Sequence, residues 1–99
     1  MAAYFIAQYQ VNDPAGYGEY QAGAGPTLAA HGAELVAFDV AAKTIEGTPP
    51  GPQTVIIKFE SVEAAEGWYN SDDYQAVVGK RLAATEGFAV ISKDMNMGG

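Results

Sequence analysis

The sequence predicts an α+β fold of the ferredoxin-like class, in the order β-α-β-β-α-β, with both helical regions on one face of an antiparallel sheet. Four short segments show the alternation of apolar and polar residues that is typical of strands. Helical spacing of apolar residues follows the first and the third of these segments. The stretch after the second, residues 43–52, is too rich in proline for a helix.

The four strands are expected at residues 4–11, 34–41, 54–60 and 88–93. Successive side chains of a strand point to opposite faces. One face of the first strand should therefore carry Phe5, Ala7, Tyr9 and Val11. The same alternation in the second strand predicts a shared face made of Val36, Phe38 and Val40.

A first helix is expected from Pro14 to His31. Asp13 can accept hydrogen bonds from the free N–H groups at its start, and proline suits the first helical position. Gly32 should end the helix, because glycine adopts the left-handed closing conformation without strain. Pro26 removes one backbone hydrogen bond, so we expect a kink within residues 22–26.

The second helical region begins at the N-cap candidate Ser61 and extends to Tyr69. Residues 70–73 indicate a break and a new cap, where the helix dipole favours the two aspartates that follow. We expect Gly87 to end the next helix. One side of that helix should carry Tyr74, Val77, Val78, Arg81 and Leu82.

The composition excludes several classes of site. The length of 99 residues predicts a single domain over residues 1–95, followed by a frayed tail at 96–99. There is no cysteine and one histidine, so we expect no bound transition metal and no other cofactor. The net charge is -7, and no basic residue precedes Lys43, which argues against nucleic-acid and anionic lipid partners.

The first residues of the chain show no targeting signal. Residues 1–4 carry no basic side chain, and no long apolar run follows them. No segment is long and apolar enough to suggest a membrane span. The expectation is therefore a soluble cytoplasmic protein.

Arg81 is the most informative polar residue, because it is the only arginine and shares a helix face with Tyr74, two turns away. That face should point inward, and a buried guanidinium requires a carboxylate or a bound anion. We expect Glu46, which precedes the turn residue Gly47, to lie within salt-bridge distance of Arg81 or one water away. The pair is either structural or functional, in which case Glu46 is a general base or an anchor for a ligand hydroxyl.

Other candidate residues also have two interpretations. His31 is either an acid–base group or a helix C-terminal residue that the dipole favours. Aromatic side chains at helical spacing form either a ligand pocket or core. The candidate ligand-binding residues are Tyr17, Tyr20, Trp68, Tyr69, Tyr74 and Arg81. Motifs for phosphate-binding loops, nucleophile elbows and zinc hydrolases are absent from the sequence.

The sheet face away from the helices should be partly apolar, since it would carry Ile6, Gln8 and Ile56. A large exposed apolar patch is unusual on a monomer. Face-to-face pairing of two sheets in a symmetric homodimer would cover it.

Several motifs resemble the DUF1330 family, a family of the dimeric α/β-barrel superfamily. They are Glu46-Gly47, the strand segment 55–61, the string Trp68-Tyr69-Asn70-Ser71-Asp72-Asp73-Tyr74-Gln75, Arg81, and the spacing of Asp13, Tyr17, Tyr20 and Pro26. The chain departs from the family pattern in having Gly32-Ala33 for a glycine pair, and Phe38-Asp39 near the place of an Arg-Gly pair. The resemblance implies a ferredoxin-like fold that pairs as a dimeric α/β barrel.

Two functions stay open at this point. Relatives in the superfamily include monooxygenases and isomerases that use no metal or flavin, so the resemblance is compatible with a cofactor-independent enzyme or a binder of a small polar or anionic molecule. The alternative is a noncatalytic dimeric structural or interaction module.

Overall fold

Four antiparallel strands form one sheet, in the order β2-β3-β1-β4, and three helices pack against it. The structure is a computed structural model, and it describes residues 1–95. The strands are β1 (Ala3–Val11), β2 (Glu34–Asp39), β3 (Gln53–Phe59) and β4 (Thr85–Lys93). The helices are α1 (Pro14–Ala30), α2 (Val62–Tyr69) and α3 (Asp72–Ala84). The predicted ferredoxin-like order is confirmed.

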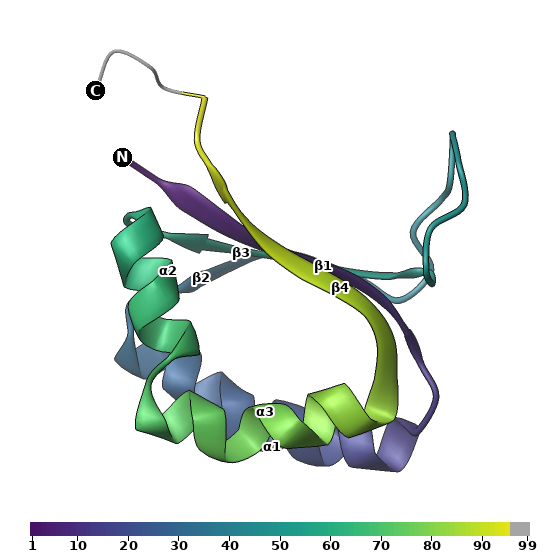
Figure 1. Ribbon diagram of the computed structural model, residues 1–99, viewed down its shortest axis with the longest axis horizontal. Helices are drawn as coiled ribbons and strands as arrows, with labels where there is room; N and C mark the ends of the chain where they lie inside the picture. Colours follow the sequence, from purple (N-terminus) through teal and green to yellow (C-terminus); the bar gives the residue numbers. More distant parts are fainter. Residues whose placement is uncertain (96–99) are drawn as a thin grey trace.

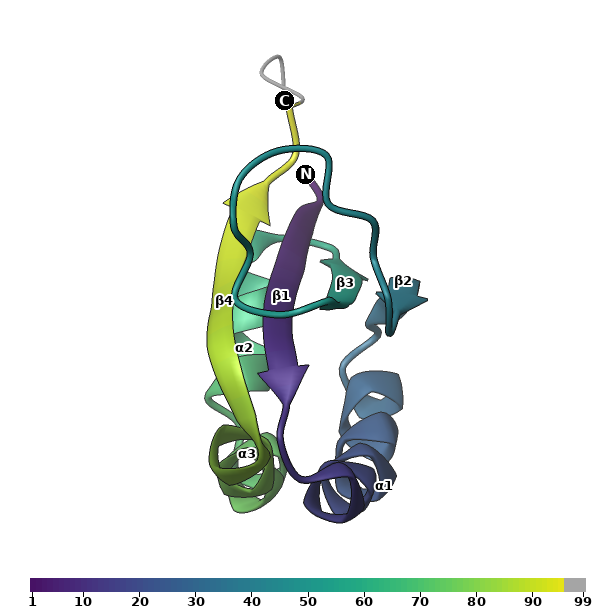
Figure 2. The same cartoon turned by 90° about the vertical axis from the view of Figure 1, so that its right-hand side faces the viewer.

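The helices all lie on one face of the sheet. Helices α1 and α3 run side by side below the strands, and α2 closes one end of the layer (Figure 1, Figure 2). None of the helices within residues 1–95 covers the opposite face of the sheet (Figure 2). None of the helices in residues 1–95 combines the length and apolar character that crossing a membrane requires.

The core lies between the sheet and the helices and is rich in aromatic side chains. Phe5, Ala7 and Tyr9 alternate on β1, and each is almost fully buried. Trp68 of α2 is completely buried, and its ring packs edge-on against Phe5 at a centroid distance of 5.3 Å. Burial of aromatic surface of this size is the main source of stability in a small domain.

The predicted helix starts are confirmed. Asp13 accepts a hydrogen bond from the backbone N–H of Gly16 at 3.1 Å, and Pro14 occupies the first position of α1. Ser61 and Ser71 cap α2 and α3 in the same way. The helix α1 continues through Pro26 and ends before Gly32, whose φ is +66°.

The prediction that Gly87 ends the last helix is wrong. Helix α3 ends at Ala84, and β4 begins at once with Thr85. Gly87 lies within β4, directly opposite Tyr9 of β1. A Cβ atom at Gly87 would come within 2.5 Å of the Cβ of Tyr9. The glycine therefore allows close approach of two strands, a role that helix-end patterns do not distinguish.

The predicted face of the second strand is also wrong. A bulge between Leu35 and Ala37 shifts the pairing of β2 with β3. Leu35 pairs with Ile57 and Phe38 pairs with Val55, so both β2 residues point toward the helices. The extra residue of a bulge breaks the period of two on which the prediction depended.

The segment between β2 and β3 projects from the sheet on the side away from the helices (Figure 1, Figure 2). A backbone hydrogen bond of 3.0 Å from Ala42 to Pro52 closes its base. Gly47, near the middle of the segment, has a φ of +77°, as its expected role in a turn requires. The tail predicted at residues 96–99 lies outside the described residues.

Candidate functional site

A pocket of about 160 Å³ lies between α1 and the sheet. Four of its lining residues are exposed and mark its mouth: Gln21 and Gly25 of α1, and Leu35 and Phe38 of β2. Its walls are mostly apolar and aromatic. The lining residues are Phe5, Tyr9, Tyr17, Tyr20, Gln21, Ala24, Gly25, Leu28, Leu35, Phe38, Val55 and Ile57.

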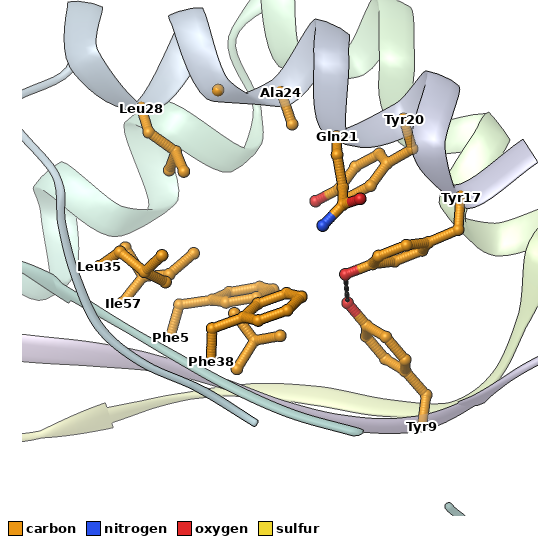
Figure 3. A pocket seen from close by; sticks show the side chains of 12 residues that line it. Phe5, Tyr9, Tyr17, Tyr20, Gln21, Ala24, Leu28, Leu35, Phe38 and Ile57 are labelled. Atoms are coloured by element: carbon orange, nitrogen blue, oxygen red, sulfur yellow. Dashed lines mark hydrogen bonds between the residues drawn. The ribbon is translucent and has the colours of Figure 1, made fainter. Parts of the chain in front are cut away.

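The polar groups of the pocket gather at one end. The hydroxyls of Tyr9 and Tyr17 share a hydrogen bond of 2.8 Å, and the amide of Gln21 points into the same space (Figure 3). Leu28 and Leu35 lie at the other end (Figure 3). The pocket thus has an apolar end and a tyrosine end.

Arg81 lies behind the tyrosine end. Its side chain is 4% exposed, and its guanidinium carbon lies 5.7 Å from the ring centre of Tyr9 and 6.0 Å from that of Tyr20. Both rings line the pocket. The hydroxyl of Tyr20 shares a hydrogen bond of 2.8 Å with that of Tyr74, which comes from α3 like Arg81. The cation is therefore surrounded by aromatic faces and phenol groups.

The tyrosines around Arg81 are neutral at physiological pH. Burial is the main cause that raises the pKa of Tyr9, Tyr20 and Tyr74. Burial is the largest influence on the pKa of Arg81 and lowers it, but attraction to the phenolates of Tyr74, Tyr20 and Tyr9, together with hydrogen bonding to Tyr74, leaves that pKa raised. Those phenolates form only in strong alkali. At neutral pH the guanidinium is charged and faces only rings and neutral hydroxyls.

The prediction of an ion pair between Arg81 and Glu46 is wrong. Within residues 1–95, no carboxylate lies within salt-bridge distance of Arg81. Glu46 is exposed in the segment that projects from the far side of the sheet, whereas Arg81 lies on α3 (Figure 1). The prediction that Arg81 is buried on the inner side of its helix is correct. The prediction for Glu46 failed because the length of a loop does not determine on which side of the sheet the loop extends.

Two buried hydrogen-bond donors near Tyr9 have no partner within residues 1–95. They are Nε of Arg81 and the amide nitrogen Nε2 of Gln53. Gln53 pairs directly with Tyr9 across the sheet, so the two side chains share the face that points to the helices. Buried donors are rarely left without an acceptor. Neither residue lines the pocket, but both lie next to Tyr9, which does.

His31 lies away from the pocket, at the C-terminal end of α1. Its Nε2 lies 3.5 Å from a carboxylate oxygen of Asp73 in the first turn of α3. Asp73 has a lowered pKa, chiefly because of its hydrogen bond with Ser71 and in smaller part because of His31. The contact joins the ends of two neighbouring helices and is exposed, which favours the helix-end interpretation of His31.

The six candidate ligand-binding residues separate into groups. Tyr17 and Tyr20 line the pocket. Trp68 and Tyr74 are fully buried behind it, and the indole N–H of Trp68 donates to the hydroxyl of Thr27 at 3.0 Å. The remaining two, Tyr69 and Arg81, also lie outside the lining.

Several lining residues were not among the candidates, notably Tyr9, Gln21 and Phe38. The alternation in the first strand placed Tyr9 on the same face as Phe5, and this signal could have identified it. For Phe38 the bulge hides the signal, as described above. Among residues 1–95, no group of three or more acidic or histidine side chains is placed to hold a metal ion.

Comparison with known proteins decides the family. Residues 2–95 match the family DUF1330, a domain of unknown function. The chain belongs to the DUF1330 family. The resemblance noted in the sequence is thereby confirmed, and the DUF1330 fold is the one described above.

Solved structures support the DUF1330 fold. A protein of unknown function from Rhodopseudomonas palustris superimposes with a TM-score of 0.76 at 17% identity, over 96% of this chain and 83% of that one. HapK from Hahella chejuensis superimposes with a TM-score of 0.61 at 15% identity, over 98% of this chain and 96% of that one. At these identities the likeness concerns the fold alone. No curated protein matches the sequence.

Proposed function

We propose that this protein binds a small organic molecule in the pocket between α1 and the sheet, with a polar or anionic group of the ligand at the tyrosine end. The observation that carries the proposal is the buried, charged Arg81 without a carboxylate partner in residues 1–95. Desolvating a charge costs several kcal/mol unless a counter-charge or strong acceptor is near. Arg81 does not itself line the pocket, so a ligand beside Tyr9 and Tyr20 would supply the counter-charge from the other side of these two side chains.

The shape of the pocket supports binding of a ligand rather than of water alone. A water molecule needs roughly 30 Å³, and the pocket of about 160 Å³ is several times larger. Ligand sites typically combine apolar walls with a few polar groups that fix the orientation. The tyrosine end and the leucine end of this pocket have that arrangement.

The chemistry of the lining favours binding over catalysis. None of the residues that line the pocket is an acid, a histidine or a lysine. General acid–base catalysis needs a group whose pKa lies near the working pH, and burial raises the pKa of Tyr9 and Tyr20 far from it. Glu46 and His31, the two other catalytic candidates, lie elsewhere. We therefore prefer a noncatalytic binding protein to a cofactor-independent enzyme.

The test is thermal unfolding with a panel of small organic acids, amides, alcohols and amines. A ligand at 100 times its Kd stabilises the folded state by about 2.7 kcal/mol, which shifts the melting temperature of a domain of this size by several degrees.

Gly25→Leu blocks the pocket, because a Cβ at this lining residue meets no atom within 4 Å and the longer side chain extends into the mouth.

Gly18→Leu is the matched control. Gly18 lies on the same helix, its Cβ would also meet nothing within 4 Å, and it does not line the pocket. Both changes raise helix propensity by the same amount. The proposal expects stabilisation by at least one compound in the wild type and Gly18→Leu, and none in Gly25→Leu. No stabilising compound, or stabilisation that survives in Gly25→Leu, contradicts it.

We further propose that the protein is a homodimer that pairs through the open sheet face. Val90 and Phe88 of β4 are 49% and 47% exposed there, next to Ile6 and Gln8 of β1. Val90→Glu should produce a particle of 10.3 kDa in light scattering, whereas Leu82→Glu, at an exposed apolar residue of α3, should not. A wild-type particle of 10.3 kDa at micromolar concentration contradicts the proposal.

A further inference from the structure

The volume of the pocket limits the size of its ligand. An engineered apolar cavity of about 150 Å³ binds benzene, and the pocket here has about 160 Å³. One six-membered ring therefore fills most of it, while a fused two-ring compound would have to extend through the mouth toward Gln21 and Gly25.

The walls favour a flat ring. Phe5 of β1 and Phe38 of β2 present their rings at the floor of the pocket, below α1 (Figure 3). Tyr17 and Tyr20 present theirs from α1 (Figure 3). Aromatic rings pack against one another in offset or edge-to-face arrangements that contribute more than their buried area. A planar ring can make such contacts with both walls, whereas a branched or saturated group cannot.

The charges favour a carboxylate at the tyrosine end. The lining has no acidic side chain that would repel an anion. Behind it lies the guanidinium of Arg81, and both Nε of Arg81 and Nε2 of Gln53 lack an acceptor within residues 1–95. Of the hydrogen-bonded hydroxyls of Tyr9 and Tyr17, one donates to the other, and the hydroxyl that accepts can donate its own hydrogen to the ligand. A carboxylate has two acceptor oxygens that could accept hydrogen bonds from these donors. Its negative charge would balance the positive charge of Arg81.

We infer that the ligand class is a one-ring aromatic carboxylate, with its ring between Phe5, Phe38 and α1 and its carboxylate toward Tyr9. This inference rests on the proposed function and adds to it the size, shape and charge of the ligand. The neutral amide of the same shape lacks the charge, and the corresponding amine carries the opposite charge beside Arg81.

The test is calorimetric titration with benzoate, benzamide and benzylamine. We expect benzoate to bind at least tenfold more tightly than benzamide, and benzylamine not to bind. Arg81→Met should bring the affinities of benzoate and benzamide to within a factor of about three, since the methionine fills similar space without charge. Gly25→Leu should abolish binding of all three, and Gly18→Leu should change none.

Gln53→Leu provides a second variant if Arg81→Met does not fold. It replaces an amide without a partner by an apolar group of similar size, so the fold should persist. The preference for benzoate over benzamide should fall by a factor of three or more. Together these results would support the inference.

Other outcomes overturn it. If benzamide binds as tightly as benzoate and Gly25→Leu blocks both, the proposed binding pocket stands but the preference for a carboxylate is wrong. If none of the three probes binds, but another compound of the panel binds and its binding is lost in Gly25→Leu, the ligand is not a one-ring aromatic carboxylate. If both Arg81→Met and Gln53→Leu keep the preference for benzoate over benzamide, the assignment of Arg81 and Gln53 to carboxylate recognition is wrong.

Discussion

Replacing Arg81 with methionine should leave the ligand-free protein as stable as the wild type, or more stable. The side chain is 4% exposed and has no carboxylate partner in residues 1–95. Burying an ion costs several kcal/mol after relaxation. The two ring contacts, at 5.7 Å and 6.0 Å, return roughly 1 kcal/mol each. The balance is unfavourable by a few kcal/mol.

Methionine removes the cost of the charge and keeps most of the apolar contact with the rings of Tyr9 and Tyr20. The free energy of unfolding should therefore rise by about 0–3 kcal/mol. Arg81→Ala should instead lose about 2 kcal/mol, because the alkyl stem no longer packs and a cavity remains. The contrast between the two variants separates the effect of charge from the effect of volume.

The assay is urea denaturation at neutral pH and one fixed protein concentration, since the stability of a dimer depends on concentration. The refuting result is a loss of more than about 1 kcal/mol in Arg81→Met with an unchanged dependence on urea. Such a loss would show that the charge is already well compensated in the empty protein. A ligand would then not be needed to supply an acceptor for Arg81.

The remaining predictions concern the strands, the tyrosines and the helix ends. Gly87→Ala should lower the free energy of unfolding by about 2 kcal/mol or more, because the added Cβ would lie 2.5 Å from the Cβ of Tyr9. Gly67→Ala is the control and should cause no such loss, because a Cβ at Gly67 meets nothing within 4 Å. Urea denaturation of both variants measures the difference. The raised pKa of Tyr20 adds stability that is fully present below its ordinary pKa of 10.0 and is lost as the pH rises above it, so Tyr20→Phe should flatten the alkaline fall in unfolding free energy. The lowered pKa of Asp73 adds stability that is present above the ordinary value of 3.8 and is lost as the pH falls below it, so wild type and Asp73→Asn should converge in acid. A difference between them that persists in acid contradicts that assignment.

Local patterns predicted much of the fold. Apolar alternation located β1 and β3, and the capping residues Asp13, Ser61 and Ser71 located the helix starts. These features depend on neighbours within a few residues, where steric and hydrogen-bonding rules act directly. The helix face that carries Arg81 was predicted correctly for Tyr74, Val78 and Arg81 for the same reason, but Leu82, which was assigned to that face, is exposed.

What failed depends on contacts between distant residues. Gly87 is needed for the approach of β4 to Tyr9, and nothing near Gly87 in the sequence indicates this. The bulge after Leu35 exists only through the pairing of β2 with β3. Glu46 was assigned to Arg81 because it lies in a loop that could approach the helix and precedes Gly47, but the direction of the loop is set by the whole sheet. The pocket itself was missed as a unit, because it joins one helix to three strands.

A crystal structure of the protein grown with benzoate would show directly whether an aromatic carboxylate occupies the pocket. We predict one molecule in the pocket of each chain, with its ring between α1 and the floor formed by Phe5 and Phe38, and its carboxylate toward Tyr9 and Tyr17. An empty pocket at a saturating concentration, or a carboxylate at the other end of the pocket beside Leu28 and Leu35, would contradict this prediction.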